Sequence, residues 1–175
     1  MAETTGPLVG ILMGSNSDLP VMEATARVLQ GFGVRYEMRC LSAHRNPEGV
    51  RDYARAALDR GLRVLVAGAG GAAHLPGVLA ASTILPVIGV PCAGKQLGGA
   101  DSLYSIVQMP PGVPVATVGI DAGRNAGILA VQILALRDRK LRPRLDKLKT
   151  DLMAENQQKD IDVVEAGRRI AEGKS

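Results

Sequence analysis

The segment Ser42–Pro47 (SAHRNP) combines side chains that can hold an anion and move a proton. Arg45 carries a planar, permanently charged guanidinium that suits a phosphate. His44 is of the residue type that titrates near neutral pH without perturbation, which suits a general acid or base. A single loop histidine is more often structural, so both roles stay open for His44 at this point. A hydrolase pair of Ser42 and His44 is disfavoured, because no GxSxG turn is present.

The segment Gly14–Asp18 (GSNSD) follows an apolar run and precedes a helical pattern. Backbone N–H groups and the positive end of a helix make such a segment a natural anion site. The hydroxyls of Ser15 and Ser17 suit a phosphate, whereas the carboxylate of Asp18 suits a ribose diol. The alternative is an ordinary helix start with Asp18 as its N-cap residue.

A third segment, Gly68–Gly77, is rich in glycine and contains the second histidine, His74. Gly68, Gly70 and Ala73 satisfy the GxGxxA spelling of a dinucleotide-binding turn. However, no acidic residue lies about 20 residues further on to hold a ribose. The glycines are better explained by close approach of the backbone to a small, flat ligand. His74 is then either a second acid/base group or a structural histidine.

The elements around these segments predict an α/β fold. Short apolar runs alternate with segments of helical spacing, which indicates a three-layer, flavodoxin-like domain with a parallel sheet of about five strands. Ligands bind outside the carboxyl ends of such strands, where all three segments lie. The expected strands are 8–13, 34–41, 62–67, 86–90 and 115–118, and the expected helices follow Asp18 and span 47–60, 72–82, 100–108 and 122–137.

The pattern predicts a single α/β catalytic domain over residues 1–139 and a C-terminal helical extension over 140–175. The extension is highly charged, and we expect an interruption of its helix at Asn156–Lys159. The formal net charge of the chain is +4, but basic and acidic residues interleave in the extension. This arrangement is typical of a solvated helix and argues against nucleic-acid binding.

Composition excludes several other classes. The segment 64–94 has no charged residue, but its repeated glycines and prolines argue against a membrane span. We expect no signal peptide, because the residues before 20 lack a basic region followed by an apolar one and a cleavage site. Aromatic residues make up only 2%, which disfavours stacking of bases or a flavin. Cys40 and Cys92 are expected to be buried free thiols in a reducing cytoplasm, and no metal site is expected.

Five motifs follow one another at compatible spacing and cover about residues 7–137. They are MGSNSD (13–18), SAHRNP (42–47), AGAGGAAHLPG (67–77), PVIGVP (86–91) and DSLYSIVQMPPGVPVATV (101–118). Together they resemble the PurE family of bacterial purine biosynthesis. The branch of that family that acts directly on carbon dioxide typically has SAHK and a different glycine loop. With SAHR and AAHLPG, this chain resembles the mutase branch.

The resemblance implies an isomerase that moves a carboxylate from the exocyclic nitrogen of N-carboxyaminoimidazole ribonucleotide to carbon 4 of the imidazole. Carbon dioxide is the implied trapped intermediate, and no cofactor is implied. His44 is implied as the acid/base catalyst, Arg45 as a phosphate ligand, and His74 as a residue that lines or orients the site. The implied substrate-binding residues are Ser15, Ser17, Asp18, Ser42, Arg45, Ala69, Gly70, Gly71, His74 and Leu75.

The resemblance also implies a homo-oligomer, an octamer in which the C-terminal helices reach neighbouring subunits and bury the bare helix 122–136. A transient contact with the ATP-dependent synthetase that makes the substrate is a further expectation, whereas no nucleic acid or membrane partner is expected. Two alternatives stay open. One is direct carboxylation of aminoimidazole ribonucleotide, and the other is a non-catalytic, flavodoxin-like nucleotide-binding module.

Overall fold

The computed structural model describes residues 6–94 and 97–173. Five strands form one parallel sheet in the order β2-β1-β3-β4-β5, which confirms the predicted α/β fold. Because β1 lies between β2 and β3, the chain reverses its direction across the sheet at β1. The loops after β1 and β3 therefore adjoin a topological switch point. The strands are β1 (Val9–Met13), β2 (Tyr36–Cys40), β3 (Val64–Gly70), β4 (Val87–Cys92) and β5 (Ala116–Thr117).

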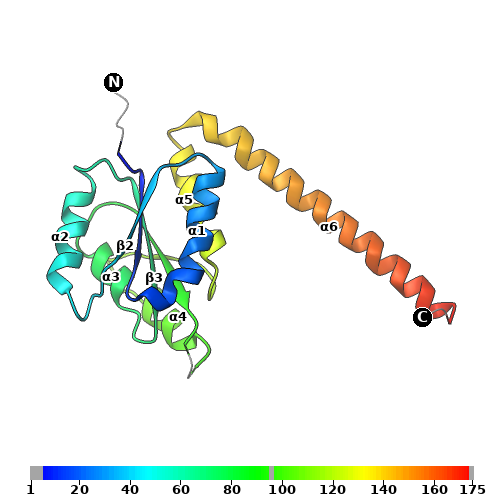
Figure 1. The fold of residues 1–175 in the computed structure, drawn as a ribbon, viewed down its shortest axis with the longest axis horizontal. Helices are drawn as coiled ribbons and strands as arrows, with labels where there is room; N and C mark the ends of the chain where they lie inside the picture. The colour runs from blue at the N-terminus through cyan, green and yellow to red at the C-terminus, as the bar shows by residue number, and fades with distance from the viewer. Residues whose placement is uncertain (1–5, 95–96, 174–175) are drawn as a thin grey trace. The chain divides into compact units, whose positions relative to one another are not determined.

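Helices cover both faces of the sheet (Figure 1). One face is covered by α1 and α5, which pack against each other, and the other by α2, α3 and α4. On the second face, Tyr53 of α2, Leu79 of α3 and Ile106 of α4 share one core with Leu65 of β3. The helices are α1 (Leu19–Gly31), α2 (Pro47–Ala57), α3 (Leu75–Ala80), α4 (Ala100–Val107) and α5 (Gly123–Ala135).

The small residues of α5 are buried within its own chain. A side chain at Gly127 would run into Val28 and the carbonyl oxygen of Thr25, so glycine lets α5 lie close to α1. The hydroxyl of Thr25 also donates a hydrogen bond of 2.7 Å to the carbonyl oxygen of Gly123. The face of α5 that packs on α1 is therefore covered within the same chain, and burial of the rest of this helix by a neighbouring subunit stays a prediction.

Several boundaries differ from the predicted ones. β3 continues through Gly68 to Gly70 and pairs with β4 as far as Cys92. The predicted helix from residue 72 begins only at Leu75, and the helix predicted to reach residue 60 ends at Ala57. In β3, hydrogen bonds to the two neighbouring strands therefore outweigh the tendency of the glycines to form a turn.

The expectation that Cys40 is buried is also wrong, since it ends the edge strand β2 and is exposed.

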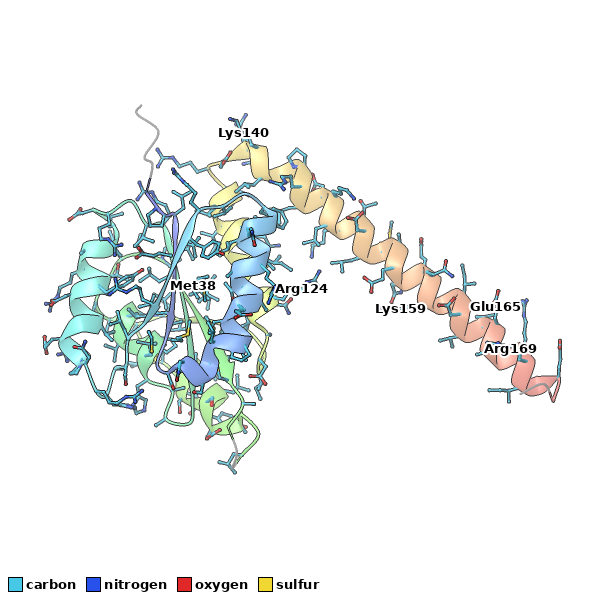
Figure 2. All side chains as sticks on the ribbon, in the orientation of Figure 1. Met38, Arg124, Lys140, Lys159, Glu165 and Arg169 are labelled. Atoms are coloured by element: carbon cyan, nitrogen blue, oxygen red, sulfur yellow. The ribbon has the colours of Figure 1, made fainter. Side chains whose placement is uncertain are left out.

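The described residues from 138 to 173 belong to a second compact unit. A short 3-10 helix, η2 (Arg139–Leu141), leads into α6 (Arg142–Ala171), which is one continuous helix with no buried residue. Charged side chains line it, including Lys159 and Glu165 (Figure 2). The predicted interruption at residues 156–159 is wrong, because Asn, Gln and Lys cost a helix little and pairs four residues apart bridge this stretch. Among the helices described, none combines the length and apolar content needed to cross a bilayer.

Candidate functional site

A cleft of about 630 Å³ opens at the carboxyl edge of the sheet. Its lining comes from the segments that follow β1, β2, β3 and β4, so it covers the switch point between β1 and β3. The fold thus gathers residues that are up to 87 positions apart, from Gly14 to Asp101, into one site. All eleven residues named as site candidates line it: Ser15, Ser17, Asp18, Ser42, His44, Arg45, Ala69, Gly70, Gly71, His74 and Leu75.

The segment after β1 forms a 3-10 helix, η1 (Asn16–Asp18), before α1 begins. The Oγ atom of Ser15 caps it by accepting a 3.3 Å hydrogen bond from the backbone N–H of Ser17. Asp18 occupies the N-cap position of α1, but its side chain makes no capping bond. Instead its carboxylate accepts a hydrogen bond of 3.3 Å from the hydroxyl of Ser17. The helix therefore does not use the carboxylate of Asp18, which is left to line the cleft.

The Asp18 side of the cleft disfavours added negative charge. Burial raises the pKa of the Asp18 carboxyl above its ordinary value, although hydrogen bonds from Ser17 and the Ser15 backbone oppose the shift. Burial also raises the pKa of the Cys92 thiol to about 12, and the charges of Asp18 and Asp121 add to that effect. An anionic ligand group is therefore better placed near Arg45 than near Cys92.

The segment after β2 is held in place at both ends. Asn46 caps α2, since its side-chain oxygen accepts a 3.0 Å hydrogen bond from the N–H of Gly49. At the other end, the backbone N–H of Arg45 donates to the hydroxyl of Ser42 at 3.3 Å. The guanidinium of Arg45 reaches across to the β1 segment and donates a 2.8 Å hydrogen bond to the carbonyl oxygen of Gly14. This bond places the arginine beside the Ser15–Ser17 hydroxyls and leaves further N–H donors for an anion.

The two histidines form a direct pair. Nε2 of His44 lies 2.8 Å from Nδ1 of His74, and the ring centroids are 4.9 Å apart with the planes nearly perpendicular. His44 follows β2 and His74 precedes α3, so the pair joins two segments across the cleft. Sequence reasoning treated each histidine separately, because a spacing of 30 residues carries no signal of contact. Both side chains, like Arg45, are exposed at the mouth of the cleft.

The glycine segment forms a backbone wall. Gly71 has a left-handed φ of +64°, and a Cβ atom added there would meet no heavy atom within 4 Å. A side chain at this position would therefore be strained and would enter open space beside the cleft. Ala69 and Leu75 are buried below this wall and supply its apolar lining. These features suit a flat ligand that lies directly against the backbone.

The first turn of α4 contributes residues that the site prediction omitted. Ser102 is fully buried; its Oγ atom accepts a 2.8 Å hydrogen bond from the N–H of Gly71 and donates a 2.7 Å bond to the carbonyl oxygen of Cys92. Asp101 itself lines the cleft. In the sequence, Asp101 and Ser102 form a polar pair at the start of an otherwise apolar helical pattern, and this pair is the feature that could have indicated their place at the site. In the described ranges, no cluster of three or more His, Cys, Asp or Glu side chains could hold a metal ion.

Comparison with known proteins gives consistent results. A family model described as AIRC: AIR carboxylase matches residues 8–155. Over 152 residues, the chain is 58% identical to a Pyrococcus abyssi protein named N5-carboxyaminoimidazole ribonucleotide mutase, and the match covers 87% of each chain. The chain is also similar to a longer Candida albicans protein named phosphoribosylaminoimidazole carboxylase. That match is 60% identical over 134 residues, which make up 77% of this chain and 24% of the Candida protein.

Among solved structures, the fold is similar to that of PurE from Treponema denticola. The TM-score is 0.74 at 34% sequence identity, and the superposition covers 89% of this chain and 95% of the other. The resemblance inferred from the five sequence motifs is thereby confirmed at the level of sequence family and of fold.

Proposed function

The chain belongs to the AIR carboxylase family, and from this membership and the cleft we propose that it is an isomerase of purine biosynthesis. It converts N-carboxyaminoimidazole ribonucleotide to 4-carboxy-5-aminoimidazole ribonucleotide. The observation that carries the proposal is the gathering of His44, Arg45 and Asp18 around one glycine-walled cleft. A proton-transfer group, a phosphate ligand, a ribose acceptor and room for a flat ring are the parts that this reaction requires.

The ribonucleotide binds by charge at one end and by shape at the other. Arg45 and the hydroxyls of Ser15, Ser17 and Ser42 hold its phosphate, because Arg45 is tethered to the segment that carries two of these hydroxyls. Asp18 accepts hydrogen bonds from the ribose diol, since its carboxylate is not used to cap α1. The imidazole lies on the backbone of residues 69–71, and Leu75 closes the apolar side.

His44 transfers a proton in each of two steps, first as an acid and then as a base. In its protonated form it gives a proton to the exocyclic nitrogen while the carbon–nitrogen bond breaks and carbon dioxide leaves. Carbon 4 of the ring then attacks the carbon of carbon dioxide and forms a carbon–carbon bond. Neutral His44 takes the proton from carbon 4, which restores aromaticity and returns the histidine to its starting form. Atoms and charge balance without any cofactor, and imidazole suits both half-steps near neutral pH.

The histidine pair determines which ring nitrogen of His44 is available. Because Nε2 is engaged by His74, Nδ1 is the nitrogen left to face the ligand. A hydrogen bond between the rings needs one protonated and one free nitrogen, so the two histidines cannot both be cations while it persists. His74 therefore acts as a positioning residue that orients the ring of His44.

Trapping carbon dioxide requires that water be kept out of the site. The cleft of a single chain is apolar at Ala69 and Leu75, but His44 and His74 are exposed at its mouth. One chain without ligand therefore does not exclude water from the site. The bound ribonucleotide and a neighbouring subunit would have to complete the enclosure.

A product assay with each candidate substrate tests the proposal. The chain is given N-carboxyaminoimidazole ribonucleotide without bicarbonate, or aminoimidazole ribonucleotide with and without bicarbonate. Isomerisation predicts carbon-carboxylated product from the first substrate alone. Product formed only from aminoimidazole ribonucleotide with bicarbonate would identify the direct carboxylase, the alternative favoured by the name of the Candida albicans relative. Binding without product from either substrate would leave a nucleotide-binding module.

We extend the proposal to the assembly and its setting. The continuous helix α6 carries exposed apolar residues, and none of its residues is buried. An octamer in which α6 packs on neighbouring subunits would cover residues such as Ile161 and Val164. Light scattering of the full chain at micromolar concentration tests this, and a monomer would contradict it. Two free cysteines suit the cytoplasm, where a transient contact with the synthetase would deliver the substrate.

A further inference from the structure

The first turn of α4 borders the cleft where β3 and β4 end. Asp101 lines the cleft together with Gly70 and Gly71 from β3 and its loop, and with Ala93 and Gly94, which follow β4. Asp101 begins the fifth motif of the family resemblance, but neither the implied site residues nor the reaction described above includes it. Its neighbour Ser102 is fully buried and bonds to the backbone of both strands. The first turn of α4 is therefore anchored to the wall on which the imidazole is proposed to lie.

The polar groups of this wall satisfy one another. The N–H of Gly71 donates to Ser102, so it is not available to a ligand, and the hydroxyl of Ser102 donates in turn to the carbonyl oxygen of Cys92. The hydroxyl of Ser105 donates to the backbone carbonyl of Asp101 at 2.7 Å and lies 3.4 Å from the carbonyl oxygen of Gly71. None of these contacts involves the carboxylate of Asp101.

One carboxylate oxygen of Asp101 stands out from this network. In the described part of the chain, Oδ1 of Asp101 is the one buried side-chain nitrogen or oxygen atom without a hydrogen-bond partner. A buried acceptor without a donor is costly, so each one in a native structure calls for an explanation, and a functional role is one of them. This oxygen has almost no exposed surface, but Asp101 itself lines the cleft, so a rotation of its side chain would bring the oxygen within reach of a donor on a bound ligand.

We propose that Asp101 is a specificity residue whose carboxylate accepts a hydrogen bond from the exocyclic N–H of the aminoimidazole. The inference rests on the function proposed above. Phosphate and carboxylate groups of that ligand offer only acceptors, and the ribose hydroxyls are assigned to Asp18. The exocyclic nitrogen is therefore the donor that remains on the ring side of the cleft. It carries one hydrogen as the carbamate and two as the amine, so the acceptor serves both ends of the reaction.

Binding of two stable ribonucleotides tests the proposal by calorimetry. The probes are aminoimidazole ribonucleotide and imidazole ribonucleotide, which lacks the amino group, and the proteins are the full-length wild type and Asp101→Asn. We expect the wild type to prefer the amino compound by about tenfold or more, as a charge-assisted hydrogen bond allows. In Asp101→Asn that preference should fall at least fivefold, while affinity for the compound without the amino group stays within twofold. A matched control, Asp59→Asn on the exposed turn after α2, should keep the full preference.

The outcomes separate this inference from the proposed function. If the wild type binds both compounds equally, or if Asp101→Asn keeps its preference, Asp101 has no such role although the function stands. If the wild type binds neither compound, the proposed function and this assignment both fall.

A ligand-free melting experiment adds a readout that is independent of binding. An acceptor kept for a ligand does not stabilise the free protein, so Asp101→Asn should melt at the wild-type temperature or above it. A fall of more than a few degrees would assign the carboxylate a structural role and overturn the proposal.

Discussion

Nε2 of His44 and Nδ1 of His74 lie 2.8 Å apart, which joins the segments after β2 and before α3 across the mouth of the cleft. One nitrogen must carry the shared proton and the other must accept it. The contact therefore fixes the orientation of the His44 ring and limits the pair to a single positive charge. A protonated acid and a neutral base, the two forms that the proposed reaction needs, are both compatible with this pair.

Replacing His44 should stop proton transfer without removing the ligand site. For His44→Asn we expect kcat to fall by about 10²- to 10⁴-fold, the usual contribution of a general acid/base group. Affinity for aminoimidazole ribonucleotide, measured by calorimetry, should change little because Arg45 and Asp18 remain. Near-normal turnover by His44→Asn would rule out the mechanism.

Replacing His74 should affect the rate through the orientation of His44. His74→Ala removes one hydrogen bond worth about 1 kcal/mol, so kcat should fall roughly fivefold to tenfold with little change in KM. His74→Asn retains a polar group near His44 and should recover part of the loss. An unchanged kcat in His74→Ala would show that the pair is incidental.

Replacing Arg45 should weaken ground-state binding. The guanidinium is held beside the β1 segment by its bond to Gly14, and loss of a charge-assisted bond to phosphate costs about 1.5–3 kcal/mol. For Arg45→Ala we therefore expect KM to rise roughly tenfold to 150-fold. Arg45→Lys should be intermediate, since it keeps the charge but not the planar fork. As a control, Arg55→Ala on the exposed side of α2 should leave KM unchanged, and an unchanged KM in Arg45→Ala would refute the phosphate role.

An acid-sensitive contact anchors the edge strand β2 to α2. The hydroxyl of Tyr53 donates a 2.7 Å hydrogen bond to Glu37, which Arg60 also contacts. Burial alone would raise the pKa of Glu37, but these hydrogen bonds and the charge of Arg60 hold it below its ordinary value of 4.5. The stabilisation is therefore complete above pH 4.5 and is lost as pH falls through the lower, folded-state pKa.

This linkage predicts the behaviour of Tyr53→Phe. At pH 7 the free energy of unfolding in denaturant should fall by about 1–2 kcal/mol, and the difference from wild type should shrink below pH 4.5. Tyr104→Phe, which alters an exposed tyrosine, should match wild type at both pH values. A Tyr53→Phe difference that stays constant from pH 7 to pH 3 would contradict the role assigned to the ionised carboxylate.

The two cysteines should differ sharply in reactivity. Cys40 is exposed, whereas Cys92 is buried and its thiol has a pKa of about 12, so almost none is thiolate at pH 8. Brief treatment with iodoacetamide at pH 8 should add one label per chain, at Cys40, as measured by mass spectrometry. A second label should follow only after unfolding. Rapid labelling of native Cys40→Ser would show that Cys92 is accessible.

Much of the fold follows from local patterns. β1, β3 and β4 are buried along nearly their whole length, and strands of that kind appear as unbroken apolar runs. The rule that ligands bind at the carboxyl ends of parallel strands then selected the three segments that line the cleft. That these segments meet at one site was predictable for this reason. The individual roles of the residues in binding and proton transfer stay predictions.

Other features could not be inferred from local patterns. The continuation of β3 through Gly68 depends on its pairing with β4, which outweighs the turn tendency of glycine. The unbroken helix α6 depends on side-chain pairs such as Glu155–Lys159 within the stretch where we expected an interruption. The exposure of Cys40 follows from the position of β2 at the edge of the sheet. Each outcome depends on which neighbour an element has, and residue type alone does not encode that.

The sequence by itself determined the fold class, the family and the three segments that supply the chemistry, because burial, turn residues and motifs act over short stretches of chain. Only the tertiary structure decided that His44 pairs with His74, that Ser102 holds the Gly71 peptide, and that Asp101 keeps an unpartnered oxygen beside the cleft. The two hydrogen bonds, His44 to His74 and Gly71 to Ser102, join residues about 30 positions apart. They exist because the strand order β2-β1-β3-β4 and the helices above it bring those positions within hydrogen-bond distance.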